Sequence, residues 1–355
     1  MMLKKNSRKN NNERGMTLIE LILSLTIFLI GIAAIYGVTR LAAIQKNTVN
    51  ARTDQLRSAR IALEYIRRDA LNAGFGYHRT GGNLPDNAGN GLFGLVSDTD
   101  TERDILTSVI AGNNLNTNVL NFGGKTDVVA FISRDPSFND GNLISYAKPV
   151  ANGNIVEVTT PDTATCTNCC SKCGKYDLYL MESSSGTTQV VGMVTKKIDD
   201  RTFQLAQGVA DDPFNLNQKA TGNVDTQSLL ITTTGGGTIK RVNMVSYSIT
   251  NAGVLIRRKY GNQALKAATE QIETRELVYG VSEFQIKYYM EDGTTIDDPS
   301  LANNGRTNQM KMNNVVQIQV SITLASDPND SQPKITTPIV IKEFISTKNL
   351  RYEAS

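Results

Sequence analysis

The sequence predicts an α+β protein in which one long N-terminal helix packs against a C-terminal, antiparallel β-rich globular head. Three observations predict this fold class. Residues 16–38 carry a single charge and no proline. Residues 39–73 contain neither glycine nor proline and repeat apolar residues at heptad-like spacing, which is typical of an amphipathic helix. The remaining chain alternates strand-like runs with turn residues, as antiparallel sheets do.

The apolar segment is long enough to cross a bilayer, because about 20 apolar residues suffice for a membrane-spanning helix. Its one charge is Glu20. A charge in hydrocarbon costs several kcal/mol, so an intramembrane carboxylate is a functional candidate. The plain alternative is an ordinary signal anchor whose Glu20 lies close enough to one end to reach the membrane interface.

The order of features before the helix is distinctive. A leader with five basic residues and one acidic residue ends at Gly15, and the apolar run starts at Met16. A secretory signal peptide has its cleavage site after the apolar region, whereas cleavage at Gly15 would leave the helix in the mature protein. This arrangement resembles the type IV prepilin family. The resemblance implies that a prepilin peptidase cuts after Gly15, that Met16 becomes N-methylated, and that Glu20 directs assembly.

Glu20 has a physical reason to direct assembly. A lone carboxylate in lipid favours any arrangement that supplies a cation, because charge attraction is strong where the dielectric constant is low. In a bundle of such helices, the free amine of a neighbouring copy's Met16 is a candidate. The resemblance implies that this pairing helps to set subunit register in pilus-like filaments.

The second half of the helix is expected to be amphipathic and to end near Ala73, with Gly74 as its C-cap. Gly31 and Gly37 interrupt the apolar half, each at about 1 kcal/mol relative to Ala. They favour either close packing between membrane helices or a bend during assembly. The predicted apolar stripe is Leu56, Ala59, Leu63, Ile66 and Ala70, and the complementary charged face is Arg57, Arg60, Glu64, Arg67 and Arg68.

The head is expected to span residues 75–355. Residues 75–126 are rich in Gly, Asn and Asp and are predicted to form loops with short strands, as an insertion lying over the helix. The strand-like runs that follow are 128–133, 155–160, 176–181, 189–195, 202–206, 228–232, 239–250, 254–260, 284–290, 315–324 and 339–346.

All four cysteines lie in one loop, at residues 166–173. An all-cysteine set suits structural zinc, but an exported location predicts oxidation. We therefore favour two disulfides over a metal site, with the pairing open, because four cysteines allow three connectivities. The four residues are Cys166, Cys169, Cys170 and Cys173.

Composition argues against several function classes. The formal charge is +3, but residues 1–15 supply +4 of it, so the mature chain is near −1. Nucleic-acid binding through bulk charge is therefore not predicted. The only histidine, His78, is expected at a surface or interface. Without a nucleophile motif, no catalytic residue, cofactor or metal is predicted, and the paired aspartates suit solvated turns better than calcium sites.

Two later stretches sharpen the resemblance. Residues 67–76 at the helix end and residues 277–293, with the closing residues 344–351, are similar to the PilW group of large minor pilins. The resemblance implies four segments: leader 1–15, membrane and filament-core helix 16–38, amphipathic extension 39–74, and head 75–355. It also implies a role in a priming or tip complex of the type IV pilus.

The implied partners are other major and minor pilins, the prepilin peptidase, the inner-membrane assembly platform and membrane lipid. The basic leader predicts a single-pass inner-membrane protein with a cytoplasmic N-terminus and a periplasmic head, which reaches the pilus or cell surface after assembly. Two alternatives stay open. One is a type II secretion pseudopilin, and the other is a membrane-anchored extracellular adhesin or enzyme with an unprocessed anchor.

Overall fold

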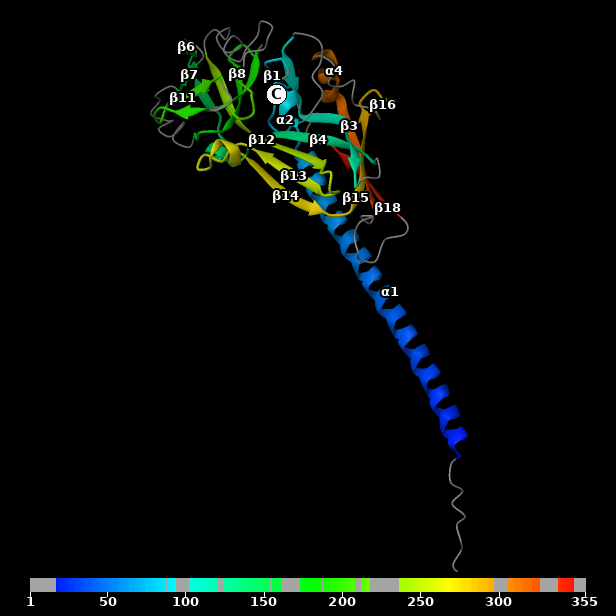
Figure 1. Ribbon diagram of the computed structural model, residues 1–355. Helices are drawn as coiled ribbons and strands as arrows, with labels where there is room; N and C mark the ends of the chain where they lie inside the picture. Colours follow the sequence, from blue (N-terminus) through cyan, green and yellow to red (C-terminus); the bar gives the residue numbers. More distant parts are fainter. Residues whose placement is uncertain are drawn as a thin grey trace, which may run out of the picture. The chain divides into compact units, whose positions relative to one another are not determined.

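The computed structural model describes residues 17–86, 88–93, 102–120, 124–147, 149–152, 155–160, 173–186, 188–207, 212–217, 236–296, 306–325 and 338–347. The chain divides into two compact units, residues 1–53 and residues 54–355. The helix α1 (Leu18–Asn72) begins in the first unit and ends in the second. The other described elements, all in the second unit, confirm the α+β class (Figure 1).

These elements are mostly strands. They are β1 (Gly82–Leu84), α2 (Ala88–Phe93), β2 (Asp104–Leu106), β3 (Val109–Val119), β4 (Gly124–Arg134), η1 (Phe138–Gly141), β5 (Ile144–Tyr146), β6 (Val150–Asn152), β7 (Ile155–Thr159), β8 (Leu178–Ser183), β9 (Gln189–Met193), β10 (Lys196–Lys197), β11 (Thr202–Ala206), β12 (Gly237–Ile249), β13 (Leu255–Tyr260), η2 (Ala268–Glu270), β14 (Ile272–Val278), β15 (Val281–Met290), β16 (Thr295–Ile296), α4 (Arg306–Lys311), η4 (Met312–Asn314), β17 (Val315–Leu324) and β18 (Ile339–Ser346).

The larger sheet is built around β12. One end of this strand pairs with β5 and β8, and its other end pairs with β4 and β13. The path of the sheet is β18-β17-β15-β4-β12-β8-β9-β1-β2, and a smaller sheet has the order β10-β11-β7-β6. Nearly all pairs are antiparallel, as expected. The exceptions are β15 with β4 and β1 with β9, which are joined in parallel at single positions.

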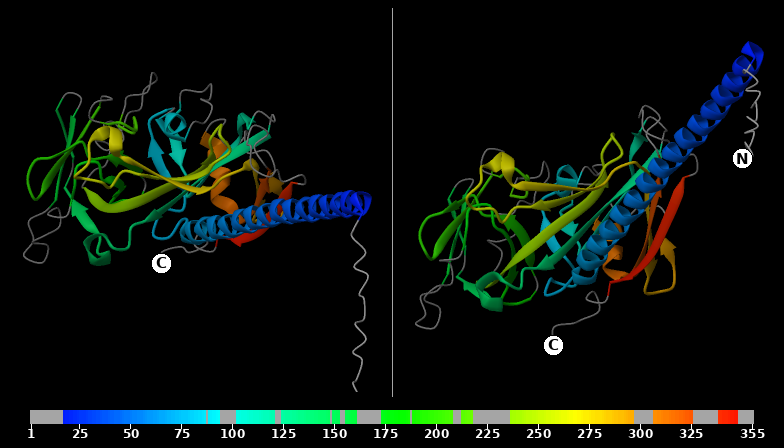
Figure 2. Two further views of the ribbon diagram at one scale, coloured as in Figure 1. Left: turned by 60° about the horizontal axis from the view of Figure 1, so that its bottom comes forward. Right: turned by 90° about the horizontal axis from the view of Figure 1, so that it is seen from below.

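The last part of α1 packs on one face of this sheet (Figure 2). Ala59, Leu63, Ile66 and Ala70 are buried together with apolar residues of β3, β4, β12, β15 and β17. The five predicted charged positions of the opposite helix face are exposed. The heptad-like stripe therefore lies where the sequence predicted it. Its small alanines allow the helix backbone to come close to the strands.

Gly74 ends the helix, as predicted. Its φ of 79° lies in the left-handed region, which costs a residue with a side chain about 1–2 kcal/mol. Its amide N donates to the carbonyl oxygen of Ile132, at 2.8 Å, instead of to the helix. The turn after α1 is therefore fixed to β4 by the backbone, and it sets the place where the helix leaves the sheet.

The prediction for residues 75–126 was wrong in one respect, because this stretch contains the eleven-residue strand β3. Its turn-like residues Gly112, Asn113 and Asn114 lie at a register shift of the β3–β4 pair, and Asn114 has a positive φ of 49°. A bulge accepts such residues within a strand. The glycine and asparagine signal was therefore local irregularity inside a strand, not a loop.

Candidate functional site: Glu20 and Asp69 of the N-terminal helix

The first turn of α1 is closed by a reciprocal pair of side chains. The amide N and Oγ1 of Thr17 each donate to Oε2 of Glu20, at 3.1 Å, and the amide N of Glu20 donates back to Thr17 Oγ1 at 3.4 Å. This is a capping box, in which two otherwise unpaired donors of a helix start are satisfied by side chains. Glu20 thus has a role within its own helix, separate from the assembly role that was predicted.

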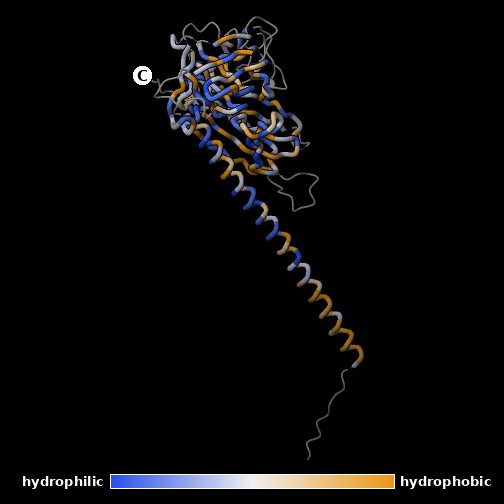
Figure 3. The backbone as a smooth tube through the Cα atoms, turned by 90° about the vertical axis from the view of Figure 1, so that its left-hand side faces the viewer, coloured by the Kyte–Doolittle hydropathy of each residue, from blue (hydrophilic) through white to orange (hydrophobic). Residues whose placement is uncertain are grey.

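The apolar half of α1 is uncovered. Within residues 18–47, every side chain is exposed, including Leu18, Ile19, Phe28 and Ile30 at 66–79%. Figure 3 shows the hydropathy of α1 changing from apolar to mixed along its length. Among the described residues, α1 is the one helix that is long and apolar enough to cross a membrane. Such a surface needs lipid or other helices around it.

The acid at the other end of the helix, Asp69, is neutralised inside the chain. Its Oδ2 accepts from Arg257 Nε at 2.7 Å and from the Tyr247 hydroxyl at 2.6 Å, and Arg68 Nε lies 3.5 Å from Oδ1. Burial lowers the pKa of Arg257, but the hydrogen bond and charge of Asp69 outweigh it and raise the pKa. Burial, assisted by Asp69, also raises the pKa of the Tyr247 hydroxyl. The network therefore keeps a charged pair and a neutral phenol.

This network resolves an unfavourable strand pairing. Arg257 on β13 stands directly opposite Arg275 on β14, and like charges in that position repel. Asp69 takes up the first cation, while the Arg275 guanidinium lies 4.8 Å from the centroid of the Tyr65 ring. The last turns of α1 thus supply both an acid and an aromatic face for two arginines of the sheet.

The remaining predicted site residues are placed as follows. Among the described residues, and apart from the adjoining turns of α1, a side chain added at Gly31 or Gly37 would meet nothing within 4 Å, so any packing role concerns other molecules. Cys173 is buried in a core cluster with β8 and β9. Gly15, Met16, Cys166, Cys169 and Cys170 lie outside the described residues, and the predicted cleavage, methylation and disulfides stay predictions.

His78 is half-buried just after the helix. Its Nδ1 lies 2.9 Å from Thr80 Oγ1 and its Nε2 lies 3.1 Å from Gln189 Nε2. The Gln189 amide N also donates to the Gly186 carbonyl, and the backbone N of Thr80 donates to His78 Nδ1 at 3.3 Å. The pKa of His78 is lowered from 6.5, because burial and the charge of Lys240 outweigh the opposite effect of Glu182. The residue links the turn after α1 to β9, as a neutral interior group.

Comparison with known proteins addresses the N-terminal segment. A family model described as "Prokaryotic N-terminal methylation motif" matches residues 10–36. No curated protein matches the chain. The motif supports a type IV prepilin-like protein and, in general terms, a pilin-like or pseudopilin-like role. Together with the apolar helix, it fits a membrane-anchored single-pass protein with a pilus or surface role.

The same motif points to a structural protein, and it implies interaction with other pilins and with a prepilin peptidase.

Two features of the site were missed from sequence. The capping box has a readable signal, because Thr17 and Glu20 have the S/T-x-x-E spacing. The Asp69–Arg257 pair had none, because its members are far apart in the chain and meet only when the helix docks.

Proposed function

We propose that this protein is a minor pilin of the PilW type that takes part in type IV pilus assembly, in a priming or tip complex, after cleavage between Gly15 and Met16. One observation carries the proposal: α1 has an exposed apolar surface, and its Glu20 makes no ion pair within the described residues. A helix of this kind is stable in the membrane before assembly and among similar helices in a filament afterwards. The free amine of a neighbouring Met16 would supply the missing cation.

The head then has a presenting role. Leaving the inner membrane through the assembly platform, the helix would enter the filament, and the β-rich head would face outward. No chemistry is assigned to it; the protein is the substrate of the peptidase. The large head and the similarity of residues 277–293 and 344–351 to the PilW group support the pilus over a type II secretion pseudopilin. An anchored adhesin or enzyme would keep its leader.

The first test is the mass and N-terminal sequence of the protein from native membranes, with and without the host's prepilin peptidase. A peptidase-dependent start at methylated Met16 is the expected result. An intact leader in both strains would overturn the proposal. Co-purification with pilus minor pilins, or instead with secretion pseudopilins, distinguishes the two assembly systems.

The second test separates the two roles of Glu20. Glu20→Gln removes the charge but preserves the capping box, which accepts Gln, whereas Thr17→Ala removes the cap partner and keeps the charge. If the charge directs assembly, Glu20→Gln abolishes incorporation into surface filaments while Thr17→Ala retains it. The reverse pattern would mean that Glu20 serves only its own helix. Membrane insertion of both variants, measured by fractionation, is the control.

A further inference from the structure

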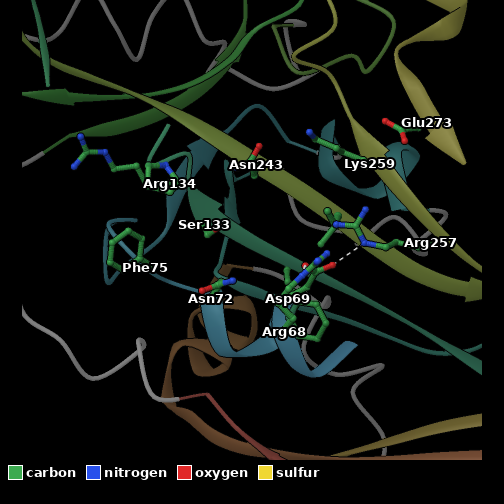
Figure 4. Close-up of a pocket in the computed structure, with 13 residues that line it drawn as sticks. Arg68, Asp69, Asn72, Phe75, Ser133, Arg134, Asn243, Arg257, Lys259 and Glu273 are labelled. Carbon is green, nitrogen blue, oxygen red and sulfur yellow. Dashed lines mark hydrogen bonds and ion pairs between the residues drawn. The ribbon is translucent and has the colours of Figure 1, made fainter. Parts of the chain in front are cut away.

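A pocket of about 600 Å³ lies in the second unit beside the last turn of α1 (Figure 4). Its volume falls within the range of about 300–1,000 Å³ that is usual for small-ligand sites. The helix end contributes Asn72, the turn after it contributes Phe75, and the sheet contributes residues from β4, β12, β13 and β14. All of these belong to one compact unit.

The pocket exists because the helix ends before the sheet face does. Along β12, alternate residues lie on one face: Tyr247 and Val245 belong to the core cluster that α1 covers, and Asn243 follows them. Phe131 and Ser133 make the same change on β4, where Ser133 pairs directly with Asn243. The sheet face is thus apolar beneath the helix and polar beyond its end.

The pocket lining has an excess of positive charge. Its four cations are Arg68, Arg134, Arg257 and Lys259, against the two carboxylates Asp69 and Glu273, a difference of two. Asp69 is already engaged by Arg257 and Arg68. Arg134 donates to the backbone carbonyl of Gly141 and so keeps its charge. Glu273 on β14 stands directly opposite Lys259 on β13, without an ion pair between them among the described contacts. A cleft with an excess of one sign of charge attracts ions of the other sign.

Several polar side chains in the lining have no hydrogen-bond partner among the described residues. Within the described part of the chain, the side chains of Asn72, Ser133, Asn243 and Lys259 make no hydrogen bond or ion pair, although the last three are half-buried. Figure 4 shows them reaching the pocket from α1, β4, β12 and β13. Polar groups that converge on a pocket can fix the orientation of a bound small molecule, and here they form most of the lining.

We propose that this pocket binds a small organic anion that carries a carboxylate or a phosphate together with hydroxyl groups. Lys259 supplies the charge-assisted hydrogen bond, and Asn72, Ser133 and Asn243 bond the hydroxyls. Phe75, which is exposed, gives an aromatic surface for the carbon skeleton. A free or surface-attached acidic sugar and a sugar phosphate share this chemistry, and the test distinguishes them.

Titration calorimetry on the full-length protein in detergent tests the proposal with three probes: a glucuronate-containing disaccharide, a nucleoside monophosphate and maltose. One or both anions should bind, more weakly as salt is added, and maltose should not. Lys259→Gln should weaken binding at least tenfold, as expected for a lost hydrogen bond to a charged group. Lys342→Gln, which removes an exposed lysine on β18, is the matched control and should leave binding unchanged.

Asn243→Ala adds a second, uncharged test and should also weaken binding. Thermal unfolding of each variant shows whether it is folded. The proposal is overturned if neither anion binds the folded wild-type protein at millimolar concentration. It is equally overturned if maltose binds as well as the anions, or if Lys259→Gln and Asn243→Ala both bind like the wild type. None of these outcomes depends on leader cleavage, so the test is independent of the proposed pilin role.

Discussion

The two halves of α1 form one continuous helix, but their apolar side chains have different surroundings. From residue 18 to residue 47 the apolar side chains are exposed, whereas Ala59, Leu63 and Ile66 are buried at 0–3% exposure by the protein's own sheet. A helix that is apolar all round needs cover from outside the chain, and an amphipathic one is covered from within. The first half is thus built to bind other molecules and the second to hold the head.

One acid from each half, Glu20 and Asp69, differs in the same way. Asp69 is paired with Arg257 and hydrogen-bonded to Tyr247 inside the chain. Glu20 makes its described hydrogen bonds only to Thr17, which carries no charge. A carboxylate in an apolar environment needs a cation. Since the chain supplies one for Asp69, that acid stabilises the head, while no described residue supplies one for Glu20.

The largest expected effect comes from the buried stripe. Ile66→Ala should lower the free energy of unfolding of the head by about 2–5 kcal/mol, because it leaves a cavity in the core. Ile61→Ala on the same helix, where the side chain is 53% exposed, should change it by about 0.5 kcal/mol or less. Ile27→Ala in the apolar half should leave it unchanged. Denaturant unfolding in detergent, monitored by near-UV circular dichroism, measures the free energy of unfolding of all three variants. Equal losses of stability would contradict the difference between the two halves of α1.

The next effect concerns Asp69 in the second half. Asp69→Asn should cost about 2–3 kcal/mol, because it leaves Arg257 without its anion beside Arg275. Glu64→Gln is the matched control, because Glu64 pairs with Arg67 where both side chains are more than half exposed. It should cost about 0–0.5 kcal/mol. Glu20→Gln should not alter head unfolding; a loss similar to that of Asp69→Asn would contradict the comparison.

Replacing a glycine by alanine should have a smaller effect on stability, and its sign should differ between the C-cap of α1 and its apolar half. Gly74→Ala should destabilise the head by about 1–2 kcal/mol, because Gly74 has a positive φ. The added methyl of Gly37→Ala meets no described atom beyond the adjoining turns of α1, so the variant should stabilise the isolated helix by about 1 kcal/mol. If Gly37 packs against other helices or permits a bend, the variant should nonetheless reduce filament formation. Normal filaments would show that Gly37 has neither role.

The smallest effect is a dependence on pH. The folded pKa of His78 is lowered from 6.5, so the unfolded chain binds more protons below that pH. Its contribution to stability is full above pH 6.5 and is lost as pH falls through the lower folded pKa. Asp212, whose pKa burial raises to about 6, acts in the opposite sense. Between pH 6.5 and 5, the free energy of unfolding should therefore fall further for the wild type than for His78→Gln. If the two proteins show the same dependence of unfolding free energy on pH, His78 does not contribute to it.

Much of this organisation was predictable from sequence. The limits of β11, β17 and β18 match the predicted runs closely, because regular alternation between turns leaves little freedom. The buried helix stripe and the cap at Gly74 were also predicted. The order of leader, Gly15, apolar run and Glu20 indicated the prepilin-like class, and the matching motif supports that class. These are local or periodic signals that need no knowledge of distant residues.

Other features depended on tertiary structure. Turn-forming residues in β3 became a bulge because β4 was available to pair with the strand on both sides of it. Asp69 meets Arg257, and Lys259 and Asn72 line the same pocket, only because the helix docks on the sheet and stops at Gly74. The sequence by itself therefore determined which stretches are helix and strand and which helix face is buried. Docking decided which charges are neutralised and where a polar pocket remains, because contacts between distant residues depend on three-dimensional packing and leave no local pattern.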